Sequence, residues 1–281
     1  MRIVSLIPSA TEILFAVGAG DDVVGVTFEC DHPPATRERR IVSTSLMPEG
    51  LAPKEIDDFV AAAVHAGEDL HRLDAGALAD LDADLVVTQD LCAVCAIDVD
   101  TVDDALAHLG CRAEVATLDP HTIDDVLATI TDVGRLTGRD QQAAAAVAAF
   151  RERLAAVEAR VAGRDRPRAL VLEWTDQPYS PGHWIPEMVT LAGGVPSMGV
   201  AGTRSSRTTW DDARASRPDV VVCAPCGYDV EGSAALAQDV RQQFPGTPVW
   251  AVDADGLFAR PGPRLVEGIE VLAGILHPEV T

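Results

Sequence analysis

The chain has 281 residues, 44 of them acidic and 22 Lys or Arg, so its formal net charge is -22, and 47% of its residues are hydrophobic. This length allows one large or two modest domains with buried cores, which excludes disorder over most of the chain. A surface this acidic repels nucleic-acid phosphates and anionic lipids, and it favours a neutral or basic partner.

Short apolar runs rich in β-branched residues alternate along the chain with segments of helical periodicity. The expected strands are 2–7, 23–28, 85–88, 169–173, 220–223 and 248–252, and the expected helices include 9–17 and 53–66. In the first helix, Ser9 is the expected N-cap and Glu12 completes a capping box. This alternation is typical of parallel sheets covered by helices, so the sequence predicts an α/β fold.

The segment 139–163 differs from the rest of the chain because it is rich in alanine and has no Gly or Pro before Gly163. Its apolar residues fall on one helix face, at Val147, Phe150, Leu154, Val157 and Val161. A helix of about 24 residues would be about 36 Å long. We therefore predict two Rossmann-like α/β lobes with parallel sheets, over 1–138 and 164–281, joined by one long helix over 139–163.

The two predicted lobes resemble each other in one short segment. Residues 81–87 and 216–222 both indicate the end of a helix, a turn and a strand. The repeat favours lobes of similar build.

Polar and aromatic side chains follow most of the predicted strands. In open parallel α/β sheets, ligands bind beyond the carboxyl ends of the strands. The resulting ligand-binding candidates are Ser9, Thr11, Cys30, Asp90, Trp174, Tyr179, His183, Trp184 and Tyr228. Trp174, Tyr179 and Trp184 lie within a short stretch of a chain that has only 4% aromatic residues. They predict either a stacking wall for a large planar ligand or a plain packing cluster.

Two Cys-x-x-Cys pairs are the candidate metal ligands: Cys92 with Cys95, and Cys223 with Cys226. Two such pairs could supply the four thiolates of a tetrahedral zinc site, although residues 96–222 lie between them, which is unlike a zinc ribbon. A redox pair and unreactive structural cysteines are the alternatives. His183 could be an axial ligand to a bound metal through a neutral imidazole, or a loop histidine bonded to backbone.

Familiar catalytic motifs are missing from the sequence, which has no Gly-x-Ser-x-Gly, no Walker A and no Gly-x-Gly-x-x-Gly after a strand. A binding protein is therefore favoured over an enzyme. The first residues run into a predicted strand without the apolar region of a signal peptide, and no apolar run is long enough for a membrane helix. We expect a cytoplasmic protein, or a periplasmic or extracellular one if a leader was removed.

Several segments together resemble the vitamin B12-binding protein family, the substrate-binding components of corrinoid and iron-chelate ABC importers. They are residues 2–18, 73–87, 191–194, 210–221, 260–264 and 277–278. The resemblance covers essentially the whole chain. It implies two lobes joined by a long helix, with the ligand between them and little change of shape on binding.

The same resemblance implies a ligand and a partner. The ligand would be cobalamin, another corrinoid or a related metal chelate. Together with the aromatic cluster, this leads us to expect that Trp174, Tyr179 and Trp184 hold the ligand between the lobes, and that His183 or a thiolate could reach its metal. In the importers, one acidic residue on each lobe docks onto permease arginines, and the matching positions are Asp74 and Asp211, both shorter than the usual glutamate. We expect neither nucleic-acid binding nor direct insertion into a membrane.

Two other functions stay open from the sequence. One is a thiol-dependent enzyme or redox protein that acts on a corrinoid or metal chelate through the two cysteine pairs. The other is a cytosolic zinc or iron protein without a tetrapyrrole.

Overall fold

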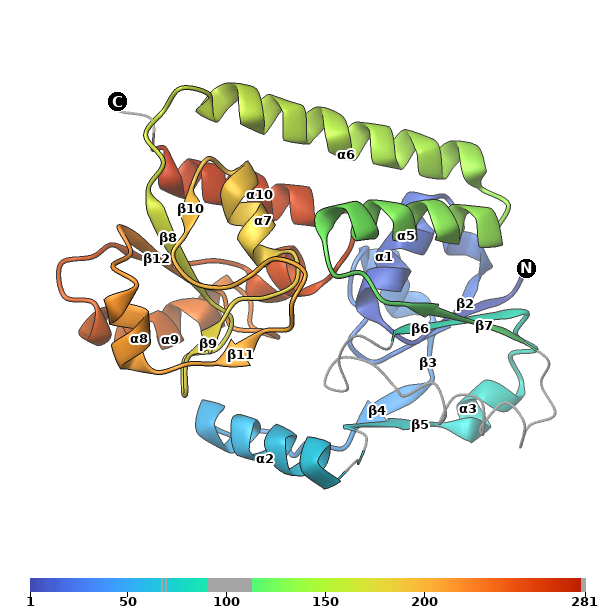
Figure 1. Ribbon diagram of the computed structural model, residues 1–281. Coiled ribbons are helices and arrows are strands. Elements are labelled where there is room, and N and C mark those ends of the chain that lie inside the picture. The colour runs from blue at the N-terminus through green and yellow to red at the C-terminus, as the bar shows by residue number, and fades with distance from the viewer. Residues whose placement is uncertain (67, 69, 90–112, 279–281) are drawn as a thin grey trace. The chain divides into compact units, whose positions relative to one another are not determined.

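The computed structural model describes residues 1–66, 68, 70–89 and 113–278, which form two compact units (Figure 1). Unit 1 comprises Met1–Pro120 and Leu127–Val147, and unit 2 comprises His121–Val126 and Ala148–Thr281. Each unit has a parallel sheet and covering helices, which confirms the predicted fold class. The chain crosses between the units three times, once after residue 120 and twice inside helices, after residues 126 and 147. The segment 139–163, predicted as a separate connector, is therefore divided between the two units.

Unit 1 is built on a five-stranded parallel sheet in the order β3-β2-β1-β6-β7. Its strands are β1 (Ile3–Ser5), β2 (Val23–Val26), β3 (Arg40–Ile41), β6 (Leu85–Gln89) and β7 (Glu114–Leu118), and β4 (Ser43–Ser45) pairs antiparallel with β5 (His71–Leu73). Its helical segments are α1 (Pro8–Ala16), η1 (Gly20–Asp22), η2 (Pro34–Glu38), α2 (Pro53–Ala66), α3 (Ala75–Ala79) and most of α5 (Ile123–Leu136). Every residue of the central strands β1 and β6 is buried, as expected for strands covered on both faces.

The start of α1 differs from the predicted capping box. The N-cap is Ile7, which makes no side-chain cap, and Pro8 opens the helix. Proline suits this position because its fixed φ is helical and its missing N–H would have had no partner in the helix. Ser9 and Glu12 are instead buried, at 2% and 4% exposure. The predicted capping box is therefore wrong, although the helix itself is confirmed.

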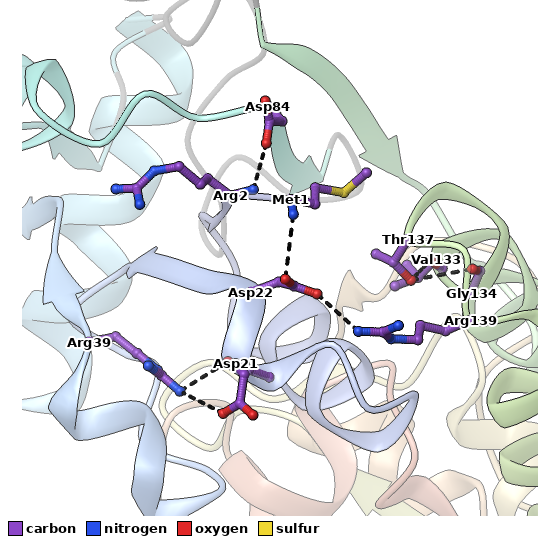
Figure 2. Close-up of polar contacts among 11 residues, drawn as sticks. Met1, Arg2, Asp21, Asp22, Arg39, Asp84, Val133, Gly134, Thr137 and Arg139 are labelled. Atoms are coloured by element: carbon purple, nitrogen blue, oxygen red, sulfur yellow. Dashed lines mark hydrogen bonds and ion pairs between the residues drawn. The ribbon is translucent and has the colours of Figure 1, made fainter.

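Ion pairs hold the end of α5 and the start of the long helix α6 (Asp140–Val161) onto the edge of unit 1 (Figure 2). The Arg139 guanidinium lies 3.3 Å from an Asp22 carboxylate oxygen, and the other oxygen of Asp22 lies 3.5 Å from the amino nitrogen of Met1. The Thr137 hydroxyl donates to the Val133 carbonyl at 2.7 Å. These contacts explain why α6 begins as part of unit 1.

Unit 2 is built on a four-stranded parallel sheet in the order β10-β8-β12-β13. Its strands are β8 (Arg168–Leu172), β10 (Val195–Pro196), β12 (Val220–Cys223) and β13 (Val249–Ala251), and β9 (Tyr179–Ser180) pairs antiparallel with β11 (Ser206–Arg207). Its helical segments are α7 (Ile185–Leu191), α8 (Trp210–Ala215), α9 (Val230–Gln243), the π-helical turn η3 (Asp255–Ala259) and α10 (Leu265–Leu276).

Both faces of the unit 2 sheet are covered. Leu170 and Leu172 lie opposite Val221 and Cys223 in the register of β8 and β12, and these four share a core with residues of α8 and α9. Figure 1 shows α7 and α10 on the opposite side of the sheet. Because side chains alternate along a strand, covering both faces requires uninterrupted apolar strands, and 220–223 is such a strand.

The long helix α6 confirms the periodicity of its sequence. It has 22 residues, equivalent to about 33 Å. Phe150 and Val157 of the predicted stripe are each only 3% exposed. The Arg153 guanidinium binds both carboxylate oxygens of Glu270 in α10, at 2.8 and 2.6 Å. Arg153 thereby lowers the pKa of Glu270, and the second half of α6 is fixed within unit 2.

A set of hydrogen bonds joins the starts of β1 and β6, the neighbouring strands at the centre of the unit 1 sheet. The Arg2 backbone N–H donates to the Asp84 carboxylate at 2.7 Å, and its guanidinium donates to the Leu81 carbonyl at 2.5 Å. The Asp84 backbone N–H returns a bond to the Arg2 carbonyl at 2.8 Å.

The same contacts recur in unit 2. The Arg168 backbone N–H donates to the Asp219 carboxylate at 2.8 Å, its guanidinium donates to the Ser216 carbonyl at 2.8 Å, and the Asp219 N–H donates to the Arg168 carbonyl at 2.8 Å. The turn residues Asp82 and Arg217 both have a positive φ, of 41° and 48°. The weak repeat between 81–87 and 216–222 therefore corresponds to one local structure that is present in both units.

Candidate functional site

The carboxyl ends of β8, β12 and β13 bring together aromatic and charged residues of unit 2. The Trp174 and Tyr228 rings, which follow β8 and β12, have centroids 5.8 Å apart. The Tyr228 carbonyl accepts hydrogen bonds from the backbone N–H groups of Ala254 and Asp255, which follow β13. We call Trp174, Tyr228, Asp253, Asp255, Arg260 and Arg264 the rim cluster.

Trp174 has an unsatisfied polar group in this cluster. Its indole nitrogen is buried and has no hydrogen-bond partner among the described residues, although the residue itself is half-buried. A buried N–H without an acceptor costs free energy that a ligand acceptor would recover. Burial also raises the pKa of the Tyr228 phenol, so that the hydroxyl stays neutral and able to donate.

The charged members of the rim cluster are paired with one another. The Arg260 guanidinium lies 2.5 Å from an Asp255 carboxylate oxygen, and the Arg264 guanidinium lies 3.6 Å from Asp253. The Asp253 carboxylate also accepts the Gly256 backbone N–H at 3.0 Å, at the start of η3. These four residues were absent from the sequence-based candidates. The sequence could have indicated two of them, because Asp253 directly follows the predicted strand 248–252 and Asp255 lies two residues further on.

Trp184 does not join Trp174 at this rim. It is only 4% exposed, and its indole N–H donates to the Phe258 carbonyl at 2.7 Å. Trp184 therefore packs in the core of unit 2, which was the alternative to a stacking wall. Its predicted role in ligand binding stays a prediction.

Tyr179 lies on the short β9 strand, opposite Arg207 of β11. The Arg207 guanidinium lies 5.9 Å from the centroid of the Tyr179 ring and donates to its hydroxyl at 3.0 Å. Arg207 thus makes a cation–π contact with the Tyr179 ring. Its predicted role in ligand binding stays a prediction.

His183 lies in a loop held by Glu173, the residue after β8. The Glu173 carboxylate accepts the Gly182 backbone N–H at 3.2 Å and the Ser205 hydroxyl at 2.5 Å. His183 has a φ of 46°, and its ring lies 5.7 Å from that of His121. Among the described residues, no three His, Cys, Asp or Glu side chains are grouped as a metal site requires. The predicted metal role of His183 stays a prediction.

In unit 1, three of the predicted ligand-binding residues are buried. Thr11 is fully buried, and its hydroxyl donates to the Ser5 hydroxyl at 2.9 Å and lies 3.0 Å from the Cys30 sulfur. Ser9 and Cys30 are 2% and 5% exposed. Thr11, Ser5 and Cys30 thus contact one another where β1 and α1 meet, and the predicted ligand-binding roles of Ser9, Thr11 and Cys30 stay predictions.

Three predicted residues, Asp90, Cys92 and Cys95, lie outside the described residues.

The other Cys-x-x-Cys pair, Cys223 with Cys226, is described, and its two thiols differ in burial. Cys223 is fully buried in the core of unit 2, and burial raises its pKa to about 12, whereas Cys226 is exposed. A thiol must ionise to bind a metal or attack a disulfide, which argues against Cys223 in either role.

Alkylation should therefore distinguish the two thiols. At pH 8, a thiol of pKa about 12 is ionised in only about one molecule in ten thousand, so iodoacetamide should modify Cys226 and leave Cys223 intact. Peptide mass mapping measures this, and alkylation in guanidinium chloride is the control that exposes both. Equal labelling of Cys223 and Cys226 in the folded protein would contradict the buried, neutral Cys223.

The two predicted docking residues differ in environment. Asp74 is the N-cap of α3 and accepts the Ala77 backbone N–H at 2.9 Å. Asp211, in the first turn of α8, has a side chain that is 92% exposed and paired with Arg214. Both are on the surface, and their docking role stays a prediction.

Comparison with known proteins identifies the family to which this chain belongs. The family model described as periplasmic binding protein matches residues 3–254, and the chain belongs to this family. In the described part of the chain, no helix is both long and apolar enough to cross a membrane.

The chain is similar to several named proteins over most of its length. The chain is 26% identical to an uncharacterised ABC transporter substrate-binding lipoprotein, YvrC, of Bacillus subtilis, over 99% of this chain and 80% of that protein. It is 27% identical to a cobalamin-binding protein of Halobacterium salinarum, over 98% of this chain and 69% of that one. A periplasmic heme-binding protein from Pseudomonas aeruginosa has the same fold, with a TM-score of 0.71 at 19% identity, over 100% and 94% of the two chains.

The chain is therefore a member of the periplasmic binding protein family, and the proteins that it resembles are named as a transporter substrate-binding lipoprotein, a cobalamin-binding protein and, by fold alone, a heme-binding protein. The Bacillus subtilis relative is named a lipoprotein, and the Pseudomonas aeruginosa protein is named periplasmic. The expectation of a cytoplasmic location finds no support among them.

Proposed function

We propose that the protein binds a corrinoid, or a closely related metal tetrapyrrole, and presents it to an ABC importer permease outside the cytoplasmic membrane. The observation that carries this proposal is the Trp174 ring, packed at 5.8 Å from Tyr228 with its buried indole N–H unsatisfied. A large planar macrocycle with polar side groups offers both a face for the ring and acceptors for the N–H.

The relatives support this ligand class. The cobalamin-binding protein of Halobacterium salinarum aligns with almost the whole chain. The rim cluster also lies beyond the carboxyl ends of parallel strands, where ligands of open α/β sheets bind.

The predicted permease contact is part of the same proposal. Asp211 is the better-placed of the two docking residues, because its carboxylate is almost fully exposed on the short helix α8. Asp74 is exposed as a residue, but its carboxylate is engaged in capping α3. We propose Asp211 and Asp74 as contacts for permease arginines.

Replacement of Trp174 by alanine should weaken corrinoid binding. A buried tryptophan at the centre of a binding surface contributes about 2 kcal/mol, so affinity should fall about thirtyfold. Titration of the purified protein with hydroxocobalamin, followed by calorimetry and by the visible spectrum, measures this. The matched control is Trp250→Ala, which removes a tryptophan that is 48% exposed on the edge strand β13.

Two results would contradict the proposal. One is the absence of any saturable signal with hydroxocobalamin at millimolar ligand. The other is an equal loss of affinity in Trp174→Ala and Trp250→Ala, which would place the ligand away from the rim cluster.

A further inference from the structure

We infer that the rim cluster selects ligands whose side groups are neutral amides and rejects ligands whose side groups are carboxylates. This inference rests on the proposed function, because it concerns the same site. It follows from how the two arginines of the cluster are paired and which partner of each pair faces the solvent.

Neither arginine presents an uncompensated positive charge. Arg260 is paired with Asp255 at 2.5 Å, and Arg264 with Asp253 at 3.6 Å. A guanidinium that is already paired with an aspartate gains less from a second carboxylate than an uncompensated one would. The cluster therefore lacks the bidentate arginine that anion recognition commonly uses.

In both pairs the carboxylate is the more exposed partner. The side chains of Asp255 and Arg260 are 33% and 8% exposed, and those of Asp253 and Arg264 are 34% and 20% exposed. A ligand that approaches this surface meets the aspartates first. The chain as a whole adds to this effect, since its net charge is -22.

The chemistry of a carboxylate then decides which ligand side groups fit. An ionised carboxylate only accepts hydrogen bonds, and each of its oxygens has more than one lone pair, so it can bind an amide N–H while it stays paired with arginine. A ligand carboxylate has no hydrogen to donate, and like charges brought together at an interface cost several kcal/mol. Asp255 thus favours an amide over an acid at the same position of a ligand.

The position of Asp255 couples this selection to the aromatic surface. Its backbone N–H donates to the Tyr228 carbonyl at 3.0 Å, and the Tyr228 ring packs on Trp174. Side groups at the edge of a macrocycle stacked on these rings would lie at the aspartates.

Arg207 is another cation of unit 2, and it lies on the β9–β11 pair. Its guanidinium lies over the Tyr179 ring and donates to the hydroxyl of that ring at 3.0 Å.

The test uses three corrinoids that share the metal and the macrocycle and differ in their side groups. They are dicyanocobinamide with amides, dicyanocobyrinic acid heptamethyl ester with neutral esters, and dicyanocobyrinic acid with carboxylates. We expect dicyanocobinamide to bind at least about tenfold more tightly than dicyanocobyrinic acid. The difference should persist in about 1 M NaCl, where the Debye length is about 3 Å and only local charges act.

The outcomes separate this inference from the proposed function. Binding of dicyanocobyrinic acid as tight as that of dicyanocobinamide would overturn the selection and leave the proposed function intact. Failure of all three corrinoids to bind would overturn the proposed function, and the inference with it. A preference that disappears in NaCl would assign the discrimination to the overall charge of the chain and overturn the role of the rim cluster.

A variant tests the aspartates directly. Asp255→Asn should shift the ratio of the two affinities about tenfold towards the carboxylate ligand. The control is Asp239→Asn, which removes the same charge from an exposed position on α9. Circular dichroism verifies folding, and Asp253→Asn replaces Asp255→Asn if the latter does not fold. An unchanged ratio in a folded variant would overturn the inference.

Discussion

Replacement of Trp184 by alanine should destabilise unit 2 by about 3 to 5 kcal/mol, the range for a large aromatic side chain removed from a core. The indole is 4% exposed, and its N–H satisfies the buried Phe258 carbonyl. The substitution removes the packing and also leaves that carbonyl without its donor. Thermal unfolding measures the loss, at about 2 to 4 °C for each kcal/mol in a unit of this size.

Trp250→Ala is the control for this experiment. Its ring is 48% exposed on the edge strand β13, so its loss should cost less than about 1 kcal/mol. A second variant, Trp184→Phe, keeps a ring but removes the N–H, and it should fall between the two. If Trp184→Ala were as stable as Trp250→Ala, the Trp184 indole would not be part of the core, and stacking of Trp184 on a ligand would be favoured instead.

Two glycines of α10 should respond in opposite ways to the same substitution. A Cβ on Gly268 would lie 2.3 Å from the Leu257 carbonyl oxygen of η3 and 2.7 Å from Met188, whereas nothing lies within 4 Å of one on Gly274. Gly268→Ala should destabilise the protein by about 1 to 3 kcal/mol, because a backbone atom cannot move aside as a flexible side chain can. Gly274→Ala should stabilise it by up to about 1 kcal/mol, since alanine favours helix more than glycine does.

The comparison is internally controlled, because both sites lie in one helix and gain the same methyl group. Chemical denaturation of the two variants beside the parent protein measures both effects. Equal stabilisation by the two substitutions would show that η3 does not pack on α10 at Gly268. Gly268→Ala should also weaken corrinoid binding, because η3 begins at Asp255 of the rim cluster.

The strand pattern was predictable from the sequence because buried parallel strands leave a local signal. The run 220–223 is apolar throughout, and the observed strand has the same bounds. The helices 53–66 and 139–163 were likewise visible from periodicity, with ends that differ little from the prediction. Strands of two residues, such as β3 and β10, have too few residues to show any period and were missed.

The candidate site was less predictable, since sequence proximity does not determine where a side chain points. Trp174 and Trp184 are ten residues apart, yet one lies at the rim and the other in the core. The sequence also does not show that the aspartates of the rim cluster are more exposed than the arginines with which they pair. Their exposure depends on the fold of η3 and its neighbours, a segment far from Trp174 in the chain.

The path of the chain through the two units limits how the protein can be divided. Unit 1 needs residues 127–147, which are made after six residues that belong to unit 2. No single cut can therefore separate the gene into two complete halves. During synthesis, the first sheet can form early, but unit 1 is complete only once α5 and the first part of α6 have left the ribosome. Fragments that end before residue 127 would lack part of their own core and should be prone to degradation.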